Sequence, residues 1–277
     1  MTGPLDLLAS RPAIWELLLR PHLGLLFDLD GTLTPIVEDP ASTVVTPSMR
    51  AVLGRLASSA TVAILTGRDV ASARRIVAID ALTYAGNHGA EWWENGRAEL
   101  LPEVGPYVAG MHRLAGLAAD ALGMVPGIYI EDKGPSVSIH YRGTPSPAES
   151  RRSILALLTR PGMGDDLAIH EGKMVVEIRP PLRIDKGTAL THLVDSRGLR
   201  SVIMFGDDQT DVDAFDALRT LRDAWKVAGD AGHRLRALWA PQTASLPRGW
   251  TNRRQPHPTC PQASRAEKVH EKVTLKK

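Results

Sequence analysis

Three apolar runs of five residues constrain the fold more than any other feature of this sequence. They are LGLLF at 23–27, TVAIL at 61–65 and SVIMF at 201–205, and each ends at turn-forming or polar residues. A short apolar run bounded by such residues is typical of a strand buried on both faces. Helical apolar spacing alternates with these runs, which predicts an α/β fold with a doubly wound parallel sheet. The expected helices are 48–58, 70–77, 188–196 and 212–221, with a further short strand at 81–85.

The middle of the chain has a different pattern. Apolar and polar residues alternate over Ser136–Arg142 and Lys173–Arg179, as in half-exposed antiparallel strands, and helices are expected at 104–122 and 149–158. We therefore expect an α+β unit at residues 104–180, inserted into a core made of residues 1–103 and 181–240. The alternation predicts that His140 and Arg142 share the face away from the core of this unit. It likewise predicts one common face for Lys173 and Glu177.

Composition excludes several classes of protein. The 277 residues carry a net charge of +2 and a single cysteine, Cys260, so no disulfide framework is expected and a reducing cytoplasm is favoured. No apolar run approaches the roughly 20 residues of a membrane helix, and no secretory leader is recognisable. Basic residues gather in 248–277, but no basic stripe with aromatics accompanies them, so no nucleic-acid partner is expected. A strand is expected at 225–229 and a disordered, atypical tail at 241–277, while the oligomeric state is left open.

Acidic residues follow two of the predicted buried strands. Asp28 and Asp30 come after the first, and Asp207, Asp208 and Asp211 come after the third. Ligands of parallel sheets bind beyond the carboxyl ends of the strands, and crowded carboxylates favour a hard divalent cation. We therefore expect a Mg²⁺ site made by Asp28, Asp30 and Asp207, with Asp208 and Asp211 supporting it.

The order of the polar segments predicts phosphoryl transfer. Asp28 is a carboxylate able to form an acyl-phosphate, and Asp30 is placed to protonate the leaving alcohol and then activate water. Thr66, in the segment Thr66-Gly67-Arg68, offers a hydroxyl and an N–H to phosphoryl oxygens. Lys186 neutralises phosphate charge and steadies the nucleophile.

On these motifs the sequence resembles the haloacid dehalogenase (HAD) superfamily, and within it the trehalose-6-phosphate phosphatases. The resemblance covers about residues 24–215. It is carried by the four segments DLDGTLTPIVEDP at 28–40, GNHGAE at 86–91, EDKGPSVSIHYR at 131–142 and EGKMVVEIRPP at 171–181. It departs from the family at Val212-Asp213, where Glu-Asp is usual, and again after Leu221, where a lost edge strand would expose the sheet.

The resemblance implies a HAD-like core with an inserted α+β cap that selects the sugar, and Mg²⁺-dependent hydrolysis of trehalose 6-phosphate. It also implies the residues that contact this sugar phosphate, namely Gly67, Arg68, Asn87, His88, Lys133, His140, Arg142, Glu171, Lys173 and Glu177. The alternatives are a phosphatase for sucrose phosphate or mannosylglycerate phosphate, or a weakly active pseudo-phosphatase because of the atypical end. A nucleic-acid binder is a further alternative, motivated by the basic tail alone.

Overall fold

The larger sheet matches the predicted parallel architecture. A computed structural model describes residues 18–37, 42–160, 167–227 and 234–239. Within these ranges seven strands form one sheet in the order β11-β10-β1-β2-β3-β4-β5. Its parallel members are β1 Leu23–Phe27, β2 Thr61–Leu65, β3 Thr83–Gly86, β10 Ser201–Gly206 and β11 Arg234–Trp239. The predicted strands 23–27 and 61–65 are confirmed to the residue, since a run of only five apolar residues between turn-forming residues is too short for a typical helix.

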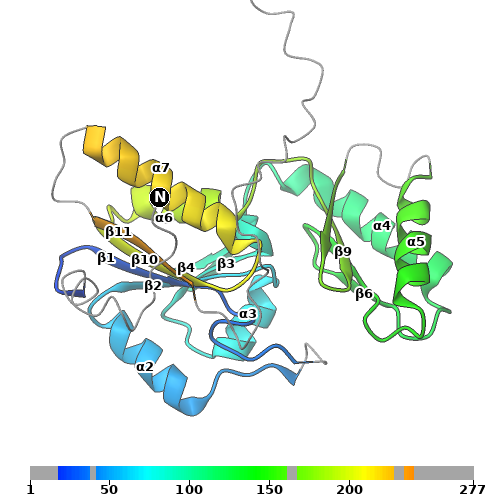
Figure 1. Cartoon of the computed structure of the whole chain (residues 1–277), viewed down its shortest axis with the longest axis horizontal. Helices are drawn as coiled ribbons and strands as arrows, with labels where there is room; N and C mark the ends of the chain where they lie inside the picture. Colours follow the sequence, from blue (N-terminus) through cyan, green and yellow to red (C-terminus); the bar gives the residue numbers. More distant parts are fainter. Residues whose placement is uncertain (1–17, 38–41, 161–166, 228–233, 240–277) are drawn as a thin grey trace, which may run out of the picture. The chain divides into compact units, whose positions relative to one another are not determined.

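Two pairs of helices cover the two faces of this sheet (Figure 1). They are α2 Pro47–Ala57 and α3 Val70–Val77 on one side, and α6 Lys186–Ser196 and α7 Asp211–Val227 on the other. Strand β1 shows how the alternation of side chains builds both cores: Leu25 and Phe27 pack with the first pair, while Leu26 packs with the second. The doubly wound arrangement is confirmed.

The inserted α+β unit is also present, and we call it the cap. Four antiparallel strands form its sheet in the order β6-β7-β9-β8, and two helices pack on one face. The elements are α4 Gly105–Leu122, β6 Tyr129–Asp132, β7 Val137–His140, α5 Pro147–Leu158, β8 Ala168–Gly172 and β9 Val175–Arg179. Ile139, Val176 and Ile178 face the helices, so the opposite face of the sheet is left for polar residues. The limits 104 and 180 stay a prediction.

Two features near the edges of the core sheet differ from expectation. The antiparallel hairpin of β4 Glu91–Glu94 and β5 Arg97–Leu100 was missed, although Asn95-Gly96 between them is a strong two-residue turn signal. The strand predicted at 225–229 is wrong, because α7 continues to Val227. No Gly or Pro interrupts the sequence from Asp211 to Val227, so nothing ends the helix earlier.

The expected loss of an edge strand is corrected as well. Strand β11 pairs in parallel with β10 from Ser201↔Arg234 to Gly206↔Trp239, so β10 has a partner on that side. The tail predicted at 241–277 lies outside the described residues. No helix in the described ranges is both long enough and apolar enough to cross a membrane.

Candidate functional site

The residues predicted to take part in catalysis lie together at the carboxyl ends of the strands in the core sheet. Strands β10, β1 and β2 are neighbours and run parallel, so the residues that follow them lie side by side. Asp28 follows β1, Thr66 follows β2 and Asp207 follows β10. The structure thus brings Asp207 next to Asp28 and Thr66, from which it is more than a hundred residues away in the sequence.

Lys186 is buried among the residues at these strand ends. It is the first residue of α6, which begins at a capping box formed by Asp185 and Thr188. Its Nζ donates to Asp28 Oδ1 at 2.6 Å and to Asp211 Oδ1 at 2.7 Å, and its side chain is only 2% exposed. Burial lowers the pKa of Lys186, but the two carboxylates outweigh that effect and raise the pKa above its ordinary value. Lys186 is therefore a fixed positive charge.

Three carboxylates lie close enough to share a cation. Asp28, Asp207 and Asp211 each offer an oxygen atom, and these atoms all lie within 4.8 Å of one another. An all-oxygen donor set suits Mg²⁺, so the residues fit the implied metal. Both oxygens of Asp211 already accept hydrogen bonds, from Lys186 and from the N–H groups of Asp207 and Asp208. This placement fits the supporting role predicted for Asp211.

Gly31 and Thr32 shape the surroundings of Asp207. Gly31 has φ +101°, and a Cβ at this position would lie 2.1 Å from a carboxylate oxygen of Asp207. Only glycine combines that backbone angle with so close an approach. Thr32 donates to Asp207 Oδ1 at 3.1 Å. Burial raises the pKa of Asp207 to about 6, against the lowering effect of Thr32. A cation here would favour the ionised carboxylate.

The carboxylate of Asp30 has a different partner from the one predicted. Arg68 donates to it through Nε at 2.6 Å and Nη2 at 2.7 Å, and Nη2 also donates to Thr43 at 3.0 Å. Asp30 is absent from the group of carboxylates within mutual reach of one cation in the described part of the chain. Its role as a metal ligand stays a prediction, while the structure pairs it with Arg68. Asp208 accepts from Thr210 and so supports the turn after β10.

The segment after β2 connects the core to the cap. Thr66 is buried, its N–H donates to Ala85, and its Oγ1 accepts from the N–H of Arg68 at 3.2 Å. The carbonyl of Gly67 accepts from Nζ of Lys133, a cap residue, at 2.9 Å. Thus Lys133 reaches the residue next to Thr66.

Asn87 and His88 form a second connection with the cap. They lie in the 3₁₀ turn Asn87–Gly89 with positive φ angles of 48° and 59°, and both are buried. Asn87 Oδ1 accepts from Ser136 of the cap at 2.9 Å. His88 Nε2 accepts from Arg179 of the cap and lies 3.2 Å from Glu177. Burial lowers the pKa of His88 to about 4, against the raising effect of Glu177.

The neutral state of His88 predicts a pH dependence of stability. A histidine in the unfolded chain takes up a proton near pH 6.5, whereas folded His88 does so only near pH 4. The contribution of neutral His88 to the free energy of unfolding is therefore complete above pH 6.5 and is lost as the pH falls toward 4. About 2 kcal/mol of it is lost by pH 5. We expect urea unfolding to show that His88→Asn, which tolerates positive φ, loses less stability between pH 7 and 5 than the wild type. Equal losses in both proteins would contradict this origin.

Four polar side chains gather on the helix-free face of the cap sheet. Lys133 Nζ lies 3.3 Å from Glu177 and 3.9 Å from Glu131, and His140 Nε2 lies 3.0 Å from Glu131. Burial raises the pKa of Glu177, but the positive charges of Lys133 and Arg179 oppose this effect, and the pKa lies well below its usual value. We call Glu131, Lys133, His140 and Glu177 the polar face of the cap.

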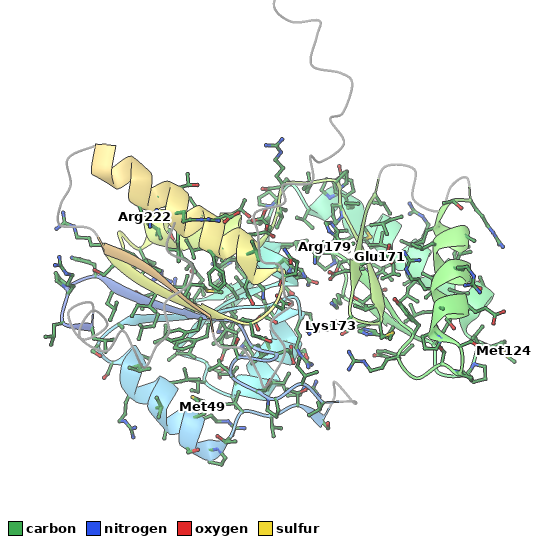
Figure 2. The ribbon with its side chains drawn as sticks, in the orientation of Figure 1. Met49, Met124, Glu171, Lys173, Arg179 and Arg222 are labelled. Carbon is green, nitrogen blue, oxygen red and sulfur yellow. The ribbon has the colours of Figure 1, made fainter. Side chains whose placement is uncertain are left out.

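Three of the predicted sugar contacts, Arg142, Glu171 and Lys173, lie outside the polar face of the cap. Glu171 is opposite Val176, on the helix side of the sheet, where Arg151 donates to it at 2.5 and 2.8 Å. Lys173 lies in the turn between β8 and β9, and Arg142 donates to its carbonyl at 3.1 Å. Figure 2 shows Lys173 at the opposite end of β9 from Arg179. The prediction that Lys173 and Glu177 share a strand face is wrong, because the two-residue turn interrupts the alternation.

Some site residues were not predicted. Arg179 follows Glu177 by two residues in the same strand, and this period of two could have placed both on one face. Glu91 accepts from Asn87 at 3.2 Å and from the N–H of Val70, the first residue of α3, at 2.9 Å. It ends the segment GNHGAE, so the motif contained it although no role was given to it.

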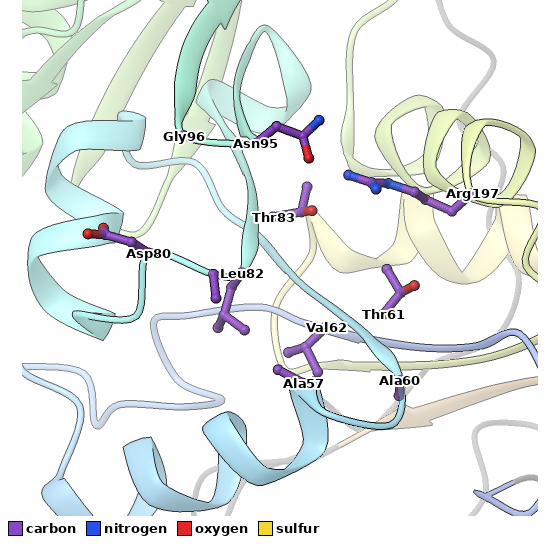
Figure 3. Close-up of a pocket in the computed structure, with 11 residues that line it drawn as sticks. Ala57, Ala60, Thr61, Val62, Asp80, Leu82, Thr83, Asn95, Gly96 and Arg197 are labelled. Atoms are coloured by element: carbon purple, nitrogen blue, oxygen red, sulfur yellow. The ribbon is translucent and has the colours of Figure 1, made fainter.

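A separate hollow of about 370 Å³ lies at the amino ends of β2 and β3 in the core sheet (Figure 3). Its lining includes Thr61 and Thr83, which begin β2 and β3, together with Asn95 and Arg197. The carboxylates and Lys186 are at the opposite ends of these strands. The hollow therefore does not contribute to the candidate site. A much smaller one, of about 20 Å³, lies where Asn87, Ser136 and Arg179 meet.

Comparison with other sequences places these features in a family context. Residues 26–233 match the sequence profile named trehalose-phosphatase. A trehalose-phosphate phosphatase of Mycobacterium avium (strain 104) is 34% identical over 225 residues, which are 79% of this chain and 54% of that protein. Trehalose-phosphate phosphatase B of Arabidopsis thaliana is 32% identical over 217 residues, 72% of this chain and 56% of that protein. The chain spans about half the length of the curated relatives it matches.

Solved structures agree on the fold. The C-terminal domain of C. albicans trehalose-6-phosphate phosphatase is similar with a TM-score of 0.67 at 24% identity, over 83% of this chain and 84% of that one. A trehalose-6-phosphate phosphatase related protein gives a TM-score of 0.64 at 24% identity, over 80% of this chain and 88% of that one. At this identity the likeness shows a shared fold, a parallel α/β core with an inserted cap.

Proposed function

Because this chain belongs to the trehalose-phosphatase family, we propose that it hydrolyses trehalose 6-phosphate to trehalose and phosphate. One observation carries the chemistry: the carboxylate of Asp28 lies at a strand end, 2.6 Å from the buried Lys186 and within reach of Asp207. A nucleophilic carboxylate, a fixed cation and a neighbouring acidic pair are the parts that phosphoryl transfer requires. We place the reaction in the cytoplasm, to which the single cysteine points.

The proposed reaction has two steps. In the first, Asp28 attacks phosphorus through Oδ2 while Lys186 holds Oδ1; the bond from phosphorus to the sugar oxygen breaks, and Asp30 gives its proton to that oxygen. In the second, Asp30 takes a proton from water, the water oxygen bonds to phosphorus, and phosphate leaves Asp28. Arg68 donates to both oxygens of Asp30 in the structure, so Asp30 must lose one of these bonds and take up a proton from water before it acts as the acid.

The remaining core residues prepare the phosphate site. Asp28 and Asp207 would hold Mg²⁺, which would supply positive charge near the phosphoryl oxygens. Asp211 holds the N–H groups of Asp207 and Asp208, and so fixes the turn that carries Asp207. We expect Thr66 to donate its hydroxyl to a phosphoryl oxygen, because Thr66 follows β2, the neighbour of the strand that Asp28 follows.

We assign sugar recognition to the polar face of the cap. Sugar hydroxyls are recognised by hydrogen bonds from charged and polar side chains, which Glu131, Lys133, His140 and Glu177 provide together. Lys133 also touches Gly67, next to the proposed phosphate-binding Thr66. This connection supports a substrate that extends from the core edge along the cap.

The test of the proposed function is phosphate release from a panel of sugar phosphates. The panel contains trehalose 6-phosphate, sucrose 6-phosphate, mannosylglycerate phosphate and glucose 6-phosphate, each with and without Mg²⁺. We expect the highest kcat/KM with trehalose 6-phosphate. A preference for another disaccharide phosphate, or no turnover of any, would contradict the proposal.

A pair of matched variants tests the role of the cap. Glu177→Gln should lower kcat/KM for trehalose 6-phosphate about 5- to 150-fold, because one lost charged hydrogen-bonding group costs about 1–3 kcal/mol. Turnover of p-nitrophenyl phosphate, which lacks the sugar, should stay unchanged. Glu171→Gln, the same change on the helix side of the sheet, serves as the control. Equal losses on both substrates would assign Glu177 to the contact between cap and core instead.

A further inference from the structure

We propose that Tyr129 is a stacking platform for the sugar ring farther from the phosphate. This inference rests on the proposed function and adds a specificity-determining residue to the same site. Tyr129 begins β6, and the residue is 59% exposed although its side chain is a large aromatic group. No part of the reaction described above uses it.

Strand geometry places Tyr129 on the polar face of the cap. Residues two apart on a strand face the same side, so Tyr129 lies on the side of Glu131, while Ile130 packs toward the cap core. Tyr129 is directly opposite His140 in the antiparallel pair of β6 and β7. The two rings lie 5.6 Å apart between centroids and are tilted by 31°. The aromatic ring and the four polar residues therefore share one surface.

The distance along β6 suits the distal ring of a disaccharide phosphate. Lys133, which directly follows this strand, donates to the carbonyl of Gly67 at 2.9 Å and so marks the end nearest the phosphate. Tyr129 is four residues away, which is about 13 Å along a strand. Two pyranose rings and a phosphate extend over a length of this order. A ligand anchored at Asp28 and lying along β6 would bring its second ring to Tyr129.

The chemistry of a pyranose ring explains why both kinds of side chain are needed. Hydroxyl groups at the rim of the ring require hydrogen-bonding partners, which the polar residues supply. The C–H groups on the face of the ring require a flat apolar surface, which a rigid aromatic side chain provides at low entropic cost. Tyr129 is opposite His140, and His140 is in turn opposite Val175 on the next strand, so the three form a row across the sheet. The row of three gives such a surface next to the polar groups.

Substrates of different length test this inference. Tyr129→Ala should raise KM and lower kcat/KM for trehalose 6-phosphate about 10-fold, with kcat nearly unchanged. Glucose 6-phosphate, which has no second ring, should be hydrolysed as well as by the wild type. Tyr129→Phe should keep activity on both substrates, since the ring is retained. Met124→Ala, a change at a residue 92% exposed beyond the end of α4, is the control for loss of exposed apolar area.

Two results would overturn the role of Tyr129. One is an equal loss on both substrates, which assigns Tyr129 to cap stability, and the other is no loss with Ala. Binding of unphosphorylated trehalose, followed by saturation-transfer NMR, separates this inference from the proposed function. If the wild type hydrolyses no sugar phosphate yet binds trehalose in a manner lost in Tyr129→Ala, the proposed function fails and the platform stands. No binding of trehalose, or binding that survives the substitution, refutes the platform.

Discussion

Replacing Asp28 with Asn should lower kcat for trehalose 6-phosphate by at least about 10³-fold while the protein remains folded. The amide has the shape of the carboxylate but lacks the charge that attacks phosphorus, and the missing rate corresponds to about 4 kcal/mol of activation free energy. Lys186 keeps its bond to Asp211 in the variant, so its charge stays paired. The measurements are phosphate release at saturating substrate and the unfolding transition by circular dichroism.

The control for this prediction is the same chemical change at a remote carboxylate. Asp195 is exposed near the end of α6, and Asp195→Asn should leave kcat unaltered. Trapping and sequencing of a phosphorylated Asp28 in the wild type would identify the bond that forms. Retention of more than about one hundredth of kcat by Asp28→Asn, a loss of only about 2.7 kcal/mol, would mean that another group is the nucleophile.

The sequence predicted those parts of the core that depend on local pattern. Strand β2 and helix α3 were predicted to the residue, because a buried run of five residues ends at Thr66 and the Asp69 side chain caps the helix. The edge hairpin was missed since its strands are only four residues long and its β5 segment RAEL carries little apolar pattern. Asn95-Gly96 was the one local signal for it, and turn chemistry alone identifies such short pairs.

The partners of the site residues depend on tertiary contacts that no local pattern contains. The bond between Arg68 and Asp30 joins residues 38 positions apart, and that between Lys186 and Asp28 joins residues 158 positions apart. The positions of these residues after the predicted strands indicated that they lie close together. They did not indicate which carboxylate pairs with which cation. In the cap, the turn before β9 prevented a correct prediction of the strand faces. Counting every second residue through Lys173 puts Glu171 and Glu177 on one face. The register of the hairpin puts them on opposite faces.

Removal of divalent cations with EDTA should lower activity by about 10³-fold or more, and Mg²⁺ should restore it. One oxygen from each of Asp28, Asp207 and Asp211 lies within 4.8 Å of the others, and burial, together with the charges of Asp211 and Asp208, raises the pKa of Asp207 to about 6. These observations indicate that the carboxylates repel one another, and a bound cation relieves that repulsion. Zn²⁺ should restore less activity, because no Cys or His belongs to this cluster in the described residues.

Thermal unfolding gives a second measurement of the same site that does not depend on catalysis. A cation that binds only the folded protein stabilises it by about 2.7 kcal/mol when its concentration is 100 times Kd, so Mg²⁺ should raise Tm. Asp207→Asn should abolish that rise, because Asp207 supplies one of the shared oxygens, whereas Asp195→Asn should preserve it. If the Asp207 variant gains as much Tm from Mg²⁺ as the wild type, the cation binds elsewhere. Full activity after EDTA treatment would show that the reaction requires no divalent cation.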